Sequence, residues 1–182
     1  MTQSEGEAEP FNWPVPFHFH FDEERGDFES EPSLILFSDG GELLGDLVRF
    51  VPDEGFLSVL SNGESSTTIK LQKVDQVRLV RPVRLQKDMD LPGDDGESVF
   101  HPPERQHFSV RFASGKELSG ETLGFFTGKF GLYLYLANEG DTVTRCFIPA
   151  QAIESYQIGD AIGQMLIDEQ VVTENDVRAG LD

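Results

Sequence analysis

Short runs of alternating apolar and polar residues, separated by turn residues, cover most of the first half of the chain. This alternation predicts β-strands, because successive side chains of a strand point to opposite faces. Ser38–Gly41 and the pair Asn62-Gly63 are typical of tight turns between strands. The strands are expected over residues 34–37, 42–50, 55–60, 67–71 and 74–80.

The same pattern returns 75 positions later, which indicates a duplicated unit. The matched pairs are Phe37 and Phe112, Gly40 and Gly115, Glu42 and Glu117, Leu43 and Leu118, and Gly45 and Gly120. With one residue inserted, Gly131–Leu136 matches Gly55–Leu60. In the second of these segments leucines alternate with Tyr133 and Tyr135, so we expect the leucines to face a core and the tyrosines to point outward or toward the other unit.

Five short strands bent by glycine close most easily as a small, partly open barrel. We therefore predict a mainly β protein with two tandem five-stranded barrels, followed by a short C-terminal helix-turn-helix. The expected divisions are an acidic flexible tail over 1–16, a first barrel over 17–81, a linker over 82–106, a second barrel over 107–158 and a helical element over 159–182.

Each unit resembles the Sm-like barrel and, more broadly, SH3-like folds, through its order of strand, glycine turn and strand with a central glycine. In the Sm family an Asp and Asn pair near the third strand holds RNA bases. The corresponding loops here, 52–55 and 128–131, contain no Asn. The resemblance thus implies the barrel without its RNA site.

The segment 161–181 is similar to the helix-turn-helix element that opens the N-terminal domain of type II secretion and type IV pilus assembly ATPases. The resemblance implies a setting near that machinery. Family members that bind cyclic di-GMP open the motif with an Arg, where this chain has Ala161, and no phosphate loop of the ATPase motor occurs. The apolar residues expected to form a partner-binding helical surface are Ile162, Leu166, Ile167, Val177 and Leu181.

The composition of the chain excludes several classes of binding partner. Lys and Arg total 14 against 33 Asp and Glu, and a net charge of -19 repels nucleic acid and anionic lipid head groups. The only cysteine, Cys146, cannot form an intramolecular disulfide, and no apolar run is long enough to span a membrane. We expect a cytoplasmic protein with a protein partner, no nucleic acid and no membrane insertion, and with homo-oligomers possible through barrel edges.

Basic residues gather in one part of this acidic chain, with Asp75 as the single acid among them. Arginine offers forked donors that match the geometry of anions. The cluster either binds a phosphorylated ligand or acidic partner or pairs with acidic segments of the same chain. The candidate residues are Lys70, Lys73, Arg78, Arg81 and Arg84.

Signs of catalysis are few. His18 and His20, followed by Asp22, resemble the start of a metallohydrolase zinc motif, but the Asp-His pair that should follow is missing. No nucleophile lies at a recognised spacing from a base, and we expect no catalytic residue, bound metal or cofactor. The sequence favours a non-enzymatic interaction or regulatory module, with a sensor of a phosphorylated ligand such as a cyclic dinucleotide and a metal-dependent hydrolase as alternatives.

Overall fold

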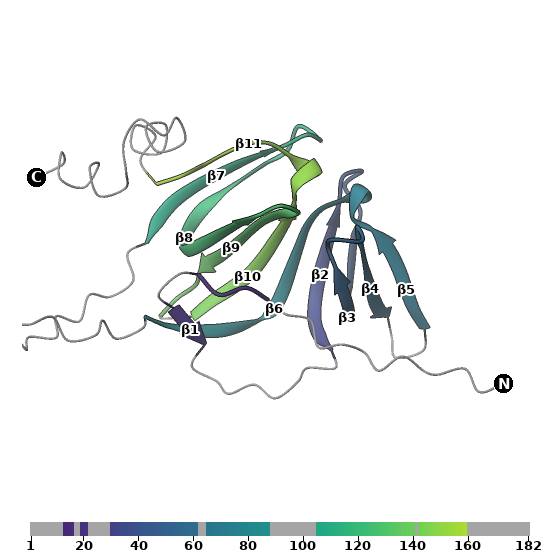
Figure 1. The fold of residues 1–182 in the computed structure, drawn as a ribbon, viewed down its shortest axis with the longest axis horizontal. Coiled ribbons are helices and arrows are strands. Elements are labelled where there is room, and N and C mark those ends of the chain that lie inside the picture. The colour runs from purple at the N-terminus through teal and green to yellow at the C-terminus, as the bar shows by residue number, and fades with distance from the viewer. Residues whose placement is uncertain are drawn as a thin grey trace, which may run out of the picture.

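The computed structural model describes residues 13–16, 19–21, 30–61, 65–87, 105–140 and 142–159, which form one antiparallel sheet of 11 strands (Figure 1). The prediction of a mainly β protein is confirmed. The strands are β1 (Phe19–Phe21), β2 (Glu31–Phe37), β3 (Glu42–Val51), β4 (Phe56–Ser61), β5 (Ser65–Lys70), β6 (Val74–Lys87), β7 (Gln106–Phe112), β8 (Glu117–Gly128), β9 (Gly131–Ala137), β10 (Thr142–Pro149) and β11 (Ile153–Ile158). Two 3-10 turns, η1 (Leu71–Lys73) and η2 (Ala150–Ala152), precede β6 and β11.

The duplication appears in the strand order. The first repeat, β2 to β6, is arranged as β6-β2-β3-β4-β5, and the second repeat, β7 to β11, is arranged as β11-β7-β8-β9-β10. The last strand of each repeat therefore lies beside its first strand. Pairing of β10 with β6 joins the two repeats into one continuous sheet, with β1 on a side branch beside β6.

Equivalent backbone hydrogen bonds recur in both repeats. Phe37 N donates to Gly41 O at 2.9 Å, and Phe112 N donates to Lys116 O at the same distance. Gly40 and Gly115 close these turns with φ of 94° and 83°, a region that favours glycine. The two turns differ only in their side chains.

The backbone does not contain the inserted residue that the sequence alignment required. Leu71 N, at the start of η1, donates to Gly55 O, and Ala150 N, at the start of η2, donates to Phe130 O. Gly55 therefore corresponds to Phe130 rather than to Gly131. The expected insertion came from matching Gly131 to Gly55. The structure instead has turns of different length: four residues lie between Val51 and Phe56 in the β3–β4 turn, and two lie between Gly128 and Gly131 in the β8–β9 turn.

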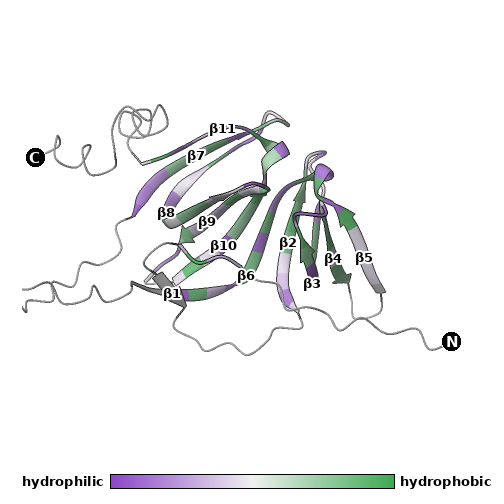
Figure 2. Ribbon diagram, viewed as in Figure 1, coloured by the Kyte–Doolittle hydropathy of each residue, from purple (hydrophilic) through white to green (hydrophobic). Residues whose placement is uncertain are grey.

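Strands β9 and β10 form a wall between two cores. Leu132, Leu134, Cys146 and Ile148 face the core of the second repeat. Tyr133, Tyr135 and Phe147, on the opposite face, belong to the core of the first repeat. The leucines thus lie where the sequence predicted, and the tyrosines point toward the other unit. Strand β6, which joins the repeats, has hydrophilic residues among its hydrophobic ones, whereas the outer strand β5 is mostly of neutral hydropathy (Figure 2).

Two segments differ from their predicted roles. Trp13, which was expected in a flexible tail, is buried, and its ring stacks on Phe50 at 5.4 Å. Strand β6 continues to Lys87 although a linker was expected from residue 82, because both β1 and β10 pair with this extension. Pro82 lies where the register of β6 and β10 shifts, a position that tolerates a residue without an N–H group. The predicted C-terminal helices lie outside the described residues.

We expect the two repeats to unfold as one unit, because the first core includes residues of the second repeat. Phe147→Ala removes a ring that lies 5.0 Å from that of Phe50 and 4.7 Å from that of Tyr133, and should lower the free energy of unfolding by about 3–5 kcal/mol. Urea titrations followed by far-UV circular dichroism and by Trp13 fluorescence should give coincident transitions. Phe130→Ala, at an exposed ring, should cost less than about 1 kcal/mol. Separate transitions would contradict a shared core.

Candidate functional site

The basic residues that are clustered in the sequence are spread along the structure. Lys70 ends β5, Lys73 ends η1, and Arg78, Arg81 and Arg84 follow along β6. Strands rise by about 3.3 Å per residue, so the 11 steps from Lys73 to Arg84 cover up to about 36 Å along the chain. The structure therefore does not bring these five residues together at one point.

Arg78 belongs to the junction between the repeats rather than to the open surface. Its Nη2 atom donates to Gln76 Oε1 at 3.3 Å, and Gln76 Nε2 donates to Cys146 Sγ at 2.9 Å. Gln76 and Cys146 are buried, and Arg78 is half-buried. This chain of contacts crosses from β6 to β10 on the face opposite Phe147.

A cleft of about 520 Å³ opens where equivalent parts of the two repeats meet. The β3–β4 turn and η1 line one side, and the β8–β9 turn and η2 line the other. Lys70 and Lys129 bring positive charge to the cleft, while Phe56 and Phe130 supply aromatic rings, and Glu54 is the one acid among the described residues that line it. The cleft can therefore receive a negatively charged group beside an apolar one.

Sequence reasoning identified Lys70 but missed Lys129 and Phe130. These residues come from a turn of the other repeat, and only pairing of the repeats brings them to Lys70. A further basic group, the guanidinium of Arg49, lies 4.9 Å above the ring of Phe56. No signal in the sequence beyond the duplication itself could have indicated this arrangement.

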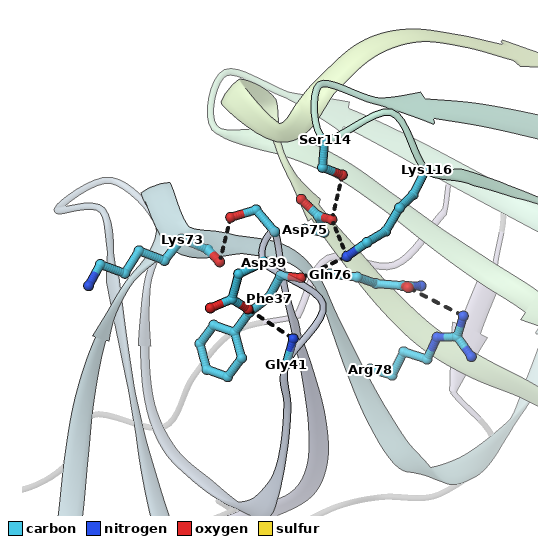
Figure 3. A network of polar contacts seen from close by, with 10 residues as sticks. Phe37, Asp39, Gly41, Lys73, Asp75, Gln76, Arg78, Ser114 and Lys116 are labelled. Carbon is cyan, nitrogen blue, oxygen red and sulfur yellow. Dashed lines mark hydrogen bonds and ion pairs between the residues drawn. The ribbon is translucent and has the colours of Figure 1, made fainter.

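A polar latch of three side chains closes one end of the junction (Figure 3). Asp75, at the start of β6, accepts hydrogen bonds from Ser114 Oγ at 2.8 Å and from Lys116 Nζ at 3.3 Å. Lys116 Nζ also donates to the backbone oxygen of Phe37 at 2.9 Å. Both partners of Asp75 come from the β7–β8 turn of the second repeat. Because only 6% of the Asp75 side chain is exposed, this carboxylate depends on those partners.

A buried ion pair also crosses the junction. Arg145 Nη2 on β10 lies 2.9 Å from Glu31 Oε1 on β2, and the two side chains are 4% and 1% exposed. Breaking such a pair by removing one partner costs much more than its net contribution, because the remaining charge stays buried. The pair therefore fixes the register in which the repeats meet.

The sheet ends in two outer strands, β5 and β11, and no described residue pairs with their outward sides. On β5, Ser66, Thr67 and Thr68 are exposed. On β11 the exposed run is Glu154–Gln157, including Tyr156. Unpaired edges offer N–H and C=O groups to another strand.

The described residues hold no group of three His, Cys, Asp or Glu side chains close enough to bind a metal ion. Of the two candidate histidines, His18 lies outside the described residues, and His20 is described only in its backbone, opposite Gln86 in the β1–β6 pair. The same part of the chain has no helix long and apolar enough to cross a membrane.

Burial suppresses ionisation at the wall between the repeats. Desolvation raises the pKa of the Cys146 thiol to about 11, against an opposing hydrogen bond from Gln76. Burial also raises the pKa of Tyr133 to about 12 and that of Tyr135 further, despite the nearby Arg145 charge. Cys146 is thus a protonated, packed thiol at neutral pH rather than a nucleophile.

Comparisons of the chain with protein-family models, with curated proteins and with solved structures give no match.

Stability should fall in alkaline solution. The pKa of Cys146 rises from 9.0 to about 11 on folding, so the folded state holds this proton more tightly. The contribution of the Cys146 thiol to the free energy of unfolding is fully present below pH 9.0 and is lost as pH rises through about 11. Urea unfolding between these values should show a falling free energy of unfolding for the native chain and a shallower fall for Cys146→Ala. Identical slopes for the two chains would contradict this assignment.

Proposed function

We propose that the protein is a non-enzymatic interaction module that binds an extended segment of a partner protein along a free edge of its sheet. The observation that supports this proposal is the presence of two outer strands of six residues each, β5 and β11, beyond which no described residue continues the sheet. Addition of a strand satisfies the backbone groups of such an edge, and neighbouring side chains then select the sequence.

In this proposal each repeat is a small, partly open barrel of the SH3-like or Sm-like kind. Three features support it: the last strand of each repeat lies beside the first, the long strands β3 and β8 contain register shifts, and Gly45 approaches Val59 and Leu60 too closely for a side chain. Bulges and glycines allow strands to coil sharply. The barrels share β9 and β10 as a common wall, and so present their edges from a fixed body.

An interaction role also accounts for the polar groups of the interior. Asp75, Glu31 and Arg145 hold the two repeats together, and Cys146 is buried, so none of them faces a substrate. The C-terminal resemblance suggests a regulatory role near type IV pilus or secretion machinery, with residues 161–181 as a further partner-binding element.

Peptides that bind this protein should protect its sheet edges. Binders selected from a random peptide library against the full chain should slow amide hydrogen exchange in β5 or β11, because an added strand covers their outward N–H groups. Exchange in the central strand β9 serves as the internal control and should not change. The absence of binders, or protection at neither edge, would contradict edge recognition.

A second candidate function is recognition of a small anionic ligand in the cleft between the repeats. The specific observation in its favour is the pairing of Lys70 and Lys129 with Phe56 and Phe130 around a 520 Å³ space. Ammonium groups bind phosphate oxygens, and aromatic rings stack on planar bases. The ligand class is then a phosphorylated compound with a ring, such as a cyclic dinucleotide.

Calorimetry with cyclic di-GMP tests the cleft. Lys70→Ala and Lys129→Ala should each weaken binding about tenfold, corresponding to about 1.4 kcal/mol, because each removes one positive charge from the cleft. Lys73→Ala is the matched control, since Lys73 is an exposed lysine outside the cleft lining, and its affinity should stay within about twofold of the native value. An absence of heat with the native protein would eliminate this ligand.

A further inference from the structure

The junction between the repeats shows which features a strand must bring to pair with the last strand of a repeat. Strand β6 pairs with β10 in a register that puts Val77 opposite Phe147 and Leu79 opposite Arg145. At the end of this pairing Asp75 meets Ser114 and Lys116 from the turn that precedes β8 (Figure 3). The acid, Asp75, lies on the last strand of the first repeat, and the base, Lys116, lies on the second repeat, which pairs with that strand.

The outer strand β11 is the counterpart of β6, and Glu154 is the counterpart of Asp75. Hydrogen bonds that flank both acids are equivalent: Ser38 N donates to Lys73 O, and Ala113 N donates to Ala152 O. Each acid also lies at a shift in register. Asp75 falls between the residues of β6 that pair with Leu36 and Phe37, and Glu154 falls between Ile153 and Ser155. Glu154 is therefore placed to meet an incoming turn as Asp75 does.

The other outer strand, β5, is the counterpart of β10, but the β2–β3 turn of its repeat, which is the counterpart of the β7–β8 turn, lacks the base. Asp39 stands where the second repeat has Ser114, and Gly41 stands where it has Lys116. If β5 of a second copy paired with β11 in the register of the junction, Thr68 would lie opposite Tyr156 and Asp39 would face Glu154. Two carboxylates would then meet where the junction has a carboxylate and the Ser114 hydroxyl, and Gly41 would supply no ammonium group in place of Lys116, which disfavours pairing.

We propose that the β11 edge accepts a strand from a different protein whose adjoining turn carries Lys or Arg against Glu154, and that Asp39 prevents a second copy of this chain from taking that place. This inference rests on the proposed edge-binding function and names the chemistry of its partner. A second difference also disfavours a second copy of this chain as the partner. Strand β5 has Ser66 and Thr68 at the positions where β10 brings Arg145 and Phe147 to the junction.

A charge-swap cycle on the full chain tests this inference by sedimentation velocity. Native protein should be monomeric, with Glu154 and Asp39 repelling each other between copies. Glu154→Lys and Asp39→Lys should each associate head to tail, at least about tenfold more strongly than the native chain, because each puts a base opposite an acid. The double variant should return to the native behaviour, since two lysines then face each other.

The association of the native chain, the two single variants and the double variant distinguishes pairing of Glu154 with Asp39 from a general effect of net charge. The double variant is the least negative chain, so a nonspecific loss of repulsion predicts that it associates most, and that result would overturn the proposal. Monomeric single variants, or a native chain that associates as strongly as they do, would also overturn it. Glu154→Gln, which removes the acid without adding a base, should associate less than Glu154→Lys.

Folding is checked for each variant by circular dichroism, and both substituted side chains are exposed. Asp39→Lys loses the hydrogen bond that Gly41 N donates to Asp39 Oδ1, so Glu154→Lys and Glu154→Gln form an independent pair on the other edge. Peptides that protect an edge while Glu154→Lys stays monomeric would refute the charge rule and leave the proposed function standing. Association of the single variants without any peptide binder would support the charge rule between copies but refute the proposed function, and with it the partner strand at β11.

Discussion

Pairing of β6 with β10 is the interaction on which the rest of the structure depends. It converts two repeats into one sheet and leaves the shared strands with a core on each face. Phe147 serves the first core while the adjacent Cys146 serves the second. A slip of one residue would move each side chain into the opposite core, so the register of this pair is under stronger constraint than that of an ordinary strand.

Polar contacts specify the register of β6 against β10, which apolar packing alone would specify only weakly. The ion pair of Glu31 and Arg145 lies on one face, and the contact of Gln76 with Cys146 lies on the other. Asp75 closes the end with two partners from the second repeat. Such buried groups are costly unless satisfied, so they penalise every arrangement except the one that pairs them. Specificity of pairing, more than added stability, is their contribution.

Local patterns made much of the fold predictable, and long-range pairing explains what could not be predicted. Alternation of side chains and the turn glycines Gly40 and Gly115 are properties of neighbouring residues, and they located the strands. The extension of β6 past Pro82 and the burial of Trp13 depend on partners far away in the sequence. The arrangement of the basic residues depends on pairing in the same way, since neighbours on an extended strand move apart, whereas Lys70 and Lys129 converge only when the repeats pair.

The shared wall delays completion of the first core during synthesis of the protein. A ribosome completes the first repeat at β6, yet Tyr133, Tyr135 and Phe147, which finish its core, are made much later. Until they emerge, Val77 and Leu79 of β6 remain open to water and to other chains. We expect the closure of so long a loop to slow folding and to leave the nascent first repeat prone to aggregation. The two repeats thus form a single body, and the first repeat does not complete its core independently of the second.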